Sequence, residues 1–348
     1  MNKELILALE ALEQEKRIKK EVMFEALEAA LVTAYKKNFG NGYNCFAEVN
    51  RENGDMRVYC SKTVVEEVED PCIEITLEEA HAVNKRYKIG DIVDFEASPA
   101  KFGRIAAQTA KQMVVQKIRE AERGNMYEEY SDKENDVMSG KVEKLDRRGI
   151  MIDLGTAEAL LAPSEQIPGE DYTPGKRLKV YVFEVKKTTK SVNLNVSRTH
   201  PGLVKKLFEQ EVPEIADGTV EIKSIAREAG SRSKLAVYSE NPNVDPVGAC
   251  VGQRGIRVAG IVQELNDEKI DVIQYSEDPA EYISAALNPA KVLSVEIDEK
   301  NKSALVTVPE FQLSLAIGKE GQNARLAARL TGWKIDIKSD KGAEEFEG

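Results

Sequence analysis

The stretch "ACVGQRGIRVAG", residues 249–260, contains two glycines in the spacing Gly-x-x-Gly, as Gly252-Gln253-Arg254-Gly255. A second stretch, "LAIGKEGQNARLAARL", residues 315–330, repeats this arrangement as Gly318-Lys319-Glu320-Gly321. The two copies lie 318 − 252 = 66 residues apart. One such spacing occurs in many turns, whereas two copies in matching surroundings indicate a duplicated domain.

The surroundings of the two loops match element by element. Residues 200–276 and residues 277–340 each predict the order α-β-β-α-α-β, with the Gly-x-x-Gly loop joining the two central helices. Even the closing strands agree, because "KIDV" at 269 corresponds to "KIDI" at 334. This order is that of the type II KH fold, so we expect two tandem KH domains.

The chemistry of such a loop favours a nucleic-acid backbone as its ligand. Glycines let a phosphate approach without interference from a Cβ atom, and the helix that follows points its free amides and positive dipole end at that phosphate. KH loops clamp about four nucleotides of a single strand. The expected RNA-binding residues are the two loops and two nearby cations: Gly252, Gln253, Arg254, Gly255, Arg257, Gly318, Lys319, Glu320, Gly321 and Arg325. The acidic Glu320 makes the second loop the weaker of the two expected clamps.

Residues 136–199 predict a small closed barrel of five short strands separated by glycine turns. The order of its signals resembles the RNA-binding OB barrel named after ribosomal protein S-one. That family often presents an aromatic residue after the first glycine and a histidine before the Ser-Glu pair, and we place Ile150 and Ala162 at these positions. Weak RNA binding is therefore expected unless other residues compensate, for which the candidates are Arg147, Arg148, Tyr181 and Phe183.

Residues 1–130 predict an N-terminal α/β domain. Asn53-Gly54 between two β-rich runs indicates a hairpin, and Thr76 with Glu79 has the spacing of a capping box. After Pro99 the sequence predicts one long amphipathic helix. Three cations, Arg104, Lys111 and Lys117, can project from one side of it, either as a solvated face or as a contact surface. The polar stretch "SDKENDVMSG" after this helix is typical of a linker.

The composition excludes several other classes of protein. Of the 348 residues, 42% are hydrophobic and 31% charged, as expected for a globular protein of several domains. The four cysteines lack CxxC spacing and there are only two histidines, so we expect no metal site, no cofactor and no catalytic triad. The start of the chain lacks the apolar run of a signal peptide, so a cytoplasmic location without membrane contact is expected. The net charge of −11 means that RNA binding must rest on local basic clusters.

Taken in order, the four domains resemble the bacterial NusA family of transcription elongation, termination and antitermination factors. The stretch "FGRIAAQTAKQMVVQKIREAER" looks particularly like the end of that family's N-terminal domain. The resemblance implies a multidomain α+β fold and a non-enzymatic, monomeric protein. It also implies that the N-terminal domain binds core RNA polymerase near the flap, with Arg104, Lys111 and Lys117 close to polymerase or exiting RNA. The barrel and KH domains would meet nascent single-stranded RNA, and other elongation and antitermination factors would be partners. An acidic tail, residues 341–348, ends the chain.

Two other functions remain possible at this point. An RNA-degrading enzyme could carry KH and barrel modules, but 348 residues cannot also hold a large catalytic domain. Clustered carboxylates such as "EEVED" at 66–70 are better interpreted as solvated surface. An RNA-binding module associated with the ribosome or with the RNA-decay machinery is the main alternative.

Overall fold

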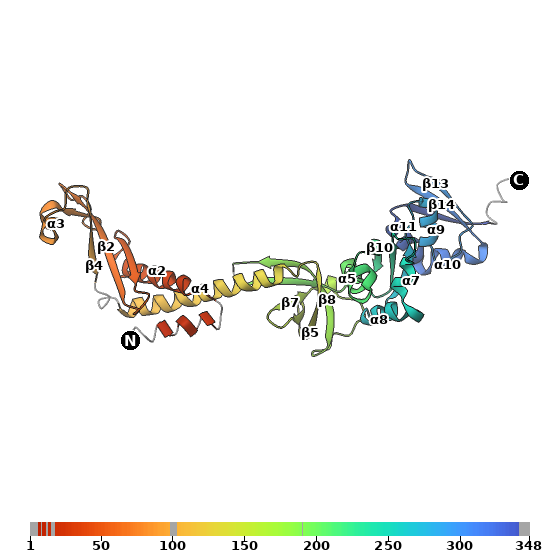
Figure 1. The fold of residues 1–348 in the computed structure, drawn as a ribbon, viewed down its shortest axis with the longest axis horizontal. Helices are drawn as coiled ribbons and strands as arrows, with labels where there is room; N and C mark the ends of the chain where they lie inside the picture. Colours follow the sequence, from red (N-terminus) through yellow and green to blue (C-terminus); the bar gives the residue numbers. More distant parts are fainter. Residues whose placement is uncertain are drawn as a thin grey trace. The chain divides into compact units, whose positions relative to one another are not determined.

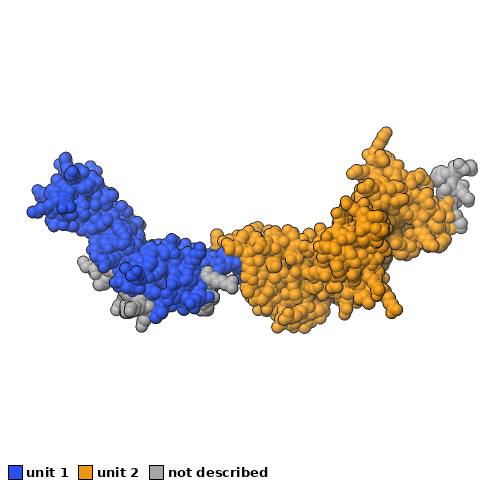
Figure 2. All heavy atoms as spheres, viewed as in Figure 1, with its two compact units in different colours: residues 1–126 blue, residues 127–348 orange. Residues whose placement is uncertain are grey.

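The structure is a computed structural model that describes residues 6–7, 9–11, 13–14, 18–97, 103–189 and 191–340. The chain divides into two compact units, residues 1–126 and 127–348, which Figure 2 shows in different colours. The predicted tail at 341–348 lies outside the described residues.

The N-terminal unit packs helix α2 (Lys20–Phe39) against a four-stranded sheet (Figure 1). The predicted hairpin is confirmed, because β1 (Asn44–Val49) and β2 (Met56–Val65) pair antiparallel with Cys45 opposite Cys60. The sheet is completed by β3 (Glu74–Thr76) and β4 (Ile92–Ala97), which both pair with β2. The short helix α3 (Leu77–Val83) begins with the predicted capping box of Thr76 and Glu79.

Helix α4 (Gly103–Ser131) confirms the predicted long amphipathic helix. The linker expected after it is wrong for the most part, because strand β5 begins at Asp136 and only residues 132–135 form a turn. Asn135 Oδ1 accepts a hydrogen bond from the Tyr181 hydroxyl, and the Asn135 amide donates to the Val182 carbonyl at 2.8 Å. These contacts tie the turn to the barrel, so a polar composition alone did not make it a free linker.

The predicted barrel is confirmed as a closed sheet in the order β5-β6-β7-β9-β8. Its interior is filled by aliphatic side chains such as Val142, Ile152, Leu161 and Val196, all fully buried. A short 3-10 helix, η2 (Pro163–Glu165), follows the third strand. The strands are β5 (Asp136–Asp146), β6 (Gly149–Asp153), β7 (Glu158–Leu161), β8 (Arg177–Lys187) and β9 (Val192–Ser197).

The two predicted duplicates have the same topology. In each, the first two strands pair antiparallel and the third lies parallel to the second. The first copy consists of α5 (Pro201–Glu211), α6 (Pro213–Ala216), β10 (Glu221–Glu228), β11 (Arg232–Tyr238), α7 (Pro246–Val251), α8 (Ile256–Glu264) and β12 (Lys269–Gln274). The second consists of α9 (Pro279–Ala286), β13 (Ser294–Asp298), β14 (Ser303–Val308), α10 (Leu313–Ile317), α11 (Gln322–Thr331) and β15 (Lys334–Ser339).

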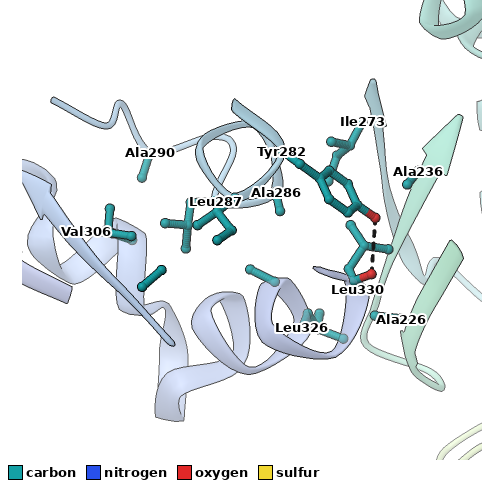
Figure 3. Close-up of a cluster of buried hydrophobic side chains, with 14 of the residues drawn as sticks. Ala226, Ala236, Ile273, Tyr282, Ala286, Leu287, Ala290, Val306, Leu326 and Leu330 are labelled. Carbon is teal, nitrogen blue, oxygen red and sulfur yellow. Dashed lines mark hydrogen bonds between the residues drawn. The ribbon is translucent and has the colours of Figure 1, made fainter. Parts of the chain in front are cut away.

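One buried apolar cluster joins the two copies (Figure 3). Ala226, Ala236 and Ile273 from the first copy pack in the same cluster as Leu326 and Leu330 of helix α11. The Tyr282 hydroxyl donates to the Leu330 carbonyl at 3.1 Å and also meets the Ser224 hydroxyl of the first copy at 2.7 Å. Since close packing resists sliding, the two copies form one continuous body and their loops are held in a fixed relation.

Candidate nucleic-acid interface

The two Gly-x-x-Gly loops have nearly identical backbones. Gly252 has φ 74° and ψ 172°, and Gly318 has φ 77° and ψ 173°. The third loop position is left-handed in both, with φ 54° at Arg254 and φ 53° at Glu320. The fourth position is left-handed as well, with φ 78° at Gly255 and φ 75° in the second copy. The duplication seen in the sequence is therefore a duplication of loop geometry.

The first glycine of each loop is required for two reasons. Its combination of φ and ψ is essentially restricted to glycine. In addition, a Cβ on Gly252 would lie 2.8 Å from Cγ of Arg257, and one on Gly318 would lie 2.8 Å from Cβ of Asn323. Arg257 and Asn323 occupy equivalent positions, since 323 − 257 = 66. The second residue after the loop thus packs directly against its first glycine in both copies.

These two packed residues brace the loops. Nη1 of Arg257 donates to the Ala249 carbonyl at 2.6 Å and to Oε2 of Glu214 at 3.0 Å. Nδ2 of Asn323 donates to the Ala316 carbonyl at 3.0 Å, near the end of the preceding helix. We expected Arg257 to offer its guanidinium to a ligand. In the structure, Nη1 of Arg257 is instead used in the contacts with Ala249 and Glu214 that stabilise the loop.

The helix that follows each loop has no side-chain cap. Helices α8 and α11 have a glycine at the N-cap position and receive no side-chain cap. A Cβ on Gly255 would meet nothing within 4 Å. The first amide of each helix donates to a loop carbonyl, that of Gln253 or of Lys319, and the amides that follow receive no capping side chain, which is the arrangement that binds phosphate. Around this end the side chains of Gln253, Arg254 and Lys319 are exposed, as is that of Glu320.

The second loop is electrostatically tied to the first KH copy. Nε of Arg325 donates to Oε1 of Glu228 at 2.6 Å, and its Nη1 donates to the carbonyl of Glu320 at 3.1 Å. Arg329 also lies 3.7 Å from the same carboxylate. Arg325 is the first cause of the lowered pKa of Glu228. The cations of α11 are thus partly neutralised, which leaves Lys319 as the loop's own cation.

The barrel offers cations but no exposed aromatic pair. Arg147 and Arg148 form the exposed turn between β5 and β6, and Nη2 of Arg148 lies 3.4 Å from Asp146. Our placement of Ile150 at the solvent-facing position is wrong, because Ile150 is 3% exposed and its neighbour Met151 points outward instead. The alternation along β6 starts one residue later than we assumed.

Tyr181 does not compensate for the missing aromatic residue. Its ring is 6% exposed and stacks on His200 with a centroid separation of 4.6 Å. Phe183 is half-buried against the same apolar cluster. Both rings pack in the apolar cluster at the junction between barrel and first KH domain, so neither ring is free to compensate.

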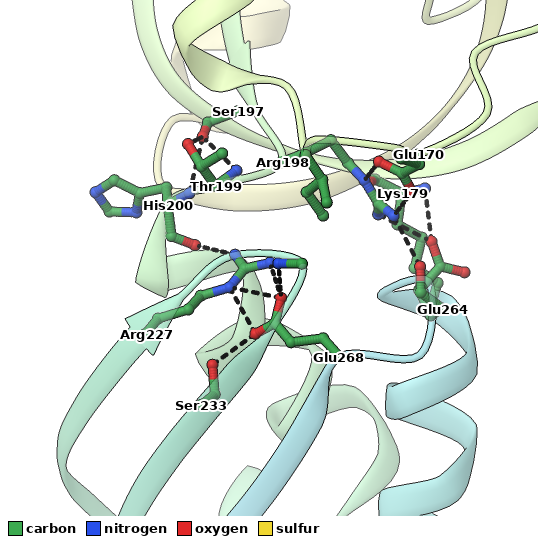
Figure 4. Close-up of polar contacts among 12 residues, drawn as sticks. Glu170, Lys179, Ser197, Arg198, Thr199, His200, Arg227, Ser233, Glu264 and Glu268 are labelled. Carbon is green, nitrogen blue, oxygen red and sulfur yellow. Dashed lines mark hydrogen bonds and ion pairs between the residues drawn. The ribbon is translucent and has the colours of Figure 1, made fainter. Parts of the chain in front are cut away.

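That junction is a feature which the sequence did not reveal (Figure 4). Arg198 is buried and pairs with the buried Glu170, and its Nη1 also lies 3.2 Å from Oε1 of Glu264 in helix α8. Beside it, Nη2 of Arg227 lies 2.9 Å from Oε2 of the fully buried Glu268. Breaking a buried pair typically costs about 3–5 kcal/mol. The barrel is therefore fixed on the first KH domain through paired charges.

The cations of helix α4 divide into three cases. Lys111 is exposed. Nζ of Lys117 lies 3.2 Å from Oε2 of Glu120 in an exposed i,i+3 pair. The side chain of Arg104 lies outside the described residues.

Two further observations concern metal sites and membrane spans. Within the described ranges, no three His, Cys, Asp or Glu side chains gather in a way that could hold a metal ion. No helix in those same ranges combines the length and apolar composition that a membrane span requires.

Comparison with known protein families assigns four domains that together cover most of the chain. It matches the NusA N-terminal domain over residues 4–124, the S1 RNA binding domain over 131–197, the NusA-like first KH domain over 198–275 and the NusA-like second KH domain over 279–345.

Curated relatives match over almost the whole chain. The transcription termination/antitermination protein NusA of Halalkalibacterium halodurans is 58% identical, over 99% of this chain and 91% of the relative. The protein of the same name from Bacillus subtilis is 56% identical, over 99% and 93%. The solution structure of the N-terminal domain of NUSA from B. subtilis is 53% identical and covers 35% of this chain and 99% of its own, with a TM-score of 0.32. The four-domain order and the identities to the two curated relatives establish that the chain belongs to the NusA family of transcription termination/antitermination proteins.

Proposed function

We propose that this protein is a non-enzymatic transcription factor that binds core RNA polymerase through its N-terminal domain and nascent single-stranded RNA through its KH pair. The polymerase contact is placed near the flap at the RNA exit channel, and the protein acts as a monomer in the cytoplasm. By holding RNA as it emerges, it modulates elongation, pausing, intrinsic termination and antitermination.

The observation that carries this proposal is the pair of equivalent loops on one rigid body. Each loop places its glycines where a phosphate would come closest. A helix without a side-chain cap begins directly after these glycines. A phosphate is the ligand that such a site takes best. The shared core keeps the two loops in a fixed relation, so a single strand can engage both in one register.

Tethering explains how an acidic protein can hold RNA at all. A chain with a net charge of −11 repels free RNA at long range. Once the N-terminal domain is bound to polymerase, the KH pair meets the transcript at an effective concentration that reaches the millimolar range for short connections. Weak contacts then suffice, including those of Arg147 and Arg148 on the barrel.

The test is a binding comparison between core polymerase and ribosomal subunits. We expect the full chain, and a variant lacking residues 127–348, to be retained by core polymerase and not by ribosomal subunits. Retention by ribosomal subunits alone would favour the alternative of a ribosome-associated module. Incubating labelled RNA with the protein and magnesium tests the non-enzymatic assignment, because cleavage that scales with protein concentration would contradict it.

A further inference from the structure

Phe311 is the most exposed large apolar side chain in the part of the chain that the structure describes, at 80%. It lies in the 3-10 turn η4 (Glu310–Gln312), which runs directly into helix α10. Exposing a phenylalanine to water is unfavourable, and this one is far more exposed than core packing would produce. Its surroundings indicate what contacts it.

An apolar strip connects Phe311 to the second Gly-x-x-Gly loop. Leu315 follows four residues later, so it lies on the same side of the helical turn, and it is 44% exposed. Ile317, 37% exposed, directly precedes Gly318 but lies on another side of the helix, because it follows Leu315 by two residues. Seven residues separate Phe311 from Gly318, a span of roughly 10 Å along a helix. We refer to Phe311 and Leu315 as the α10 strip, and Lys319 of the loop follows Leu315 by four residues.

The first KH copy has a different surface at the equivalent positions. Asp245 corresponds to Phe311, since 311 − 245 = 66, and its Oδ1 accepts a hydrogen bond from the Val247 amide at 3.1 Å. Ala249 corresponds to Leu315. One copy thus carries a helix-capping carboxylate and a small residue where the other carries an exposed ring and a leucine. The fold does not require an aromatic residue at this position.

The two copies also differ in charge at the loop itself. The first loop carries Arg254, whereas the second carries Lys319 beside the acidic Glu320. Arg325, which could have added charge, is held by Glu228. The copy with the weaker electrostatic clamp is therefore the copy with the apolar strip.

We propose that Phe311 is a base-stacking residue, on which a nucleobase of the single-stranded RNA held by the Lys319–Glu320 loop stacks. This rests on the proposed function. The strip is continuous with that loop, and a span of about four nucleotides is what a KH loop engages. Every base has an apolar face that can stack on a ring, and such a contact needs no charge.

The test measures binding of short single-stranded RNA, with 2-aminopurine at successive positions, to the full chain. In the parent protein, one position shows quenched fluorescence. Phe311→Ala removes this quenching and weakens binding by about 5- to 100-fold. The dependence of affinity on salt is unchanged, because a neutral contact releases no counterions. Since the side chain is 80% exposed, these variants keep the parent fold.

Two substitutions separate stacking from general apolar contact. Phe311→Tyr keeps the ring and retains quenching and affinity, whereas Phe311→Leu keeps apolar bulk and loses the quenching. Parent-like affinity and quenching in Phe311→Ala would overturn the proposal.

A loop control separates this proposal from the function on which it rests. Gly321→Asp and Gly321→Asn have nearly the same shape and differ by one charge facing the phosphate. If both bind RNA equally well, the proposed clamp fails. If only the Asp variant is weakened while Phe311→Ala binds like the parent, the clamp stands and the stacking proposal fails.

Discussion

The two loops should respond in opposite directions to removal of their third side chain. Arg254 and Glu320 have nearly the same backbone, with φ, ψ of 54°, 24° and 53°, 29°, and both are exposed. Any difference between them therefore comes from charge. We predict that Arg254→Gln weakens binding of single-stranded RNA and that Glu320→Gln strengthens it.

The size of the effect follows from counterion release. On a single strand each neutralised phosphate adds about 0.7 to the slope of log affinity against log salt. Between 1 M and 0.1 M salt, one contact is therefore worth about fivefold in affinity, or roughly 1 kcal/mol. Arg254→Gln should lose about this factor at 0.1 M salt and flatten the slope by about 0.7.

Fluorescence anisotropy with a labelled single strand, titrated at several salt concentrations, measures both quantities. Thermal melting of each variant checks that the fold is retained, as expected for exposed side chains. An unchanged salt slope in Arg254→Gln would refute the reasoning, and so would a change of the same sign in both variants.

Three further predictions concern stability, each measured by urea denaturation of the full chain. Glu170→Gln should lower the free energy of unfolding by up to about 3–5 kcal/mol, because it removes one of the two carboxylates that pair with the buried Arg198 and leaves only Glu264. Burial lowers the pKa of His200 below its ordinary value of 6.5. As pH falls, His200 is therefore protonated in the unfolded state before it is protonated in the folded state. The free energy of unfolding is highest above about pH 6.5 and falls as the pH drops below this value. Nδ1 of His200 caps helix α5 by accepting a hydrogen bond from the Gly202 amide at 3.0 Å. His200→Asn, which keeps a capping acceptor, should reduce that pH dependence, and an unaltered profile would contradict the assignment. Gly255→Ala should cost about 1–2 kcal/mol for its left-handed backbone. Gly252→Ala should lower the free energy of unfolding by more than this, because its Cβ would also overlap the side chain of Arg257. Equal losses in the two variants would contradict the packing of Arg257 against the loop.

Local signals predicted the elements and their order well. The capping box at Thr76, the hairpin around Asn53-Gly54 and the duplicated loops all depend on residues close in sequence, so their spacing is visible without a structure. The error at Ile150 shows that sequence patterns do not always fix the register of a strand to a single residue. A shift of one residue along a strand exchanges the buried and exposed faces, and the glycine turn before it did not fix which residue came first.

Contacts between distant residues could not be predicted. Arg325 and Glu228 are 97 positions apart, and the sequence alone presents Arg325 as a free cation near the loop. Arg198 and Glu264 are 66 positions apart, the first directly after the last barrel strand and the second in helix α8. Their pairing depends on how barrel and KH copies pack, which no periodicity encodes. The pattern therefore predicted the geometry of the two loops, whereas it did not predict which nearby cations are paired.

The central claim is that both Gly-x-x-Gly loops bind RNA phosphates. Its most direct test compares two double variants of the full chain, Gly255→Asp with Gly321→Asp, and Gly255→Asn with Gly321→Asn. The left-handed backbone is accommodated equally well by Asp and Asn, so the pair differs in charge alone. The account predicts that the Asn variant keeps affinity for single-stranded RNA close to that of the parent, while the Asp variant loses at least about tenfold. Equal affinity of the two variants would contradict it.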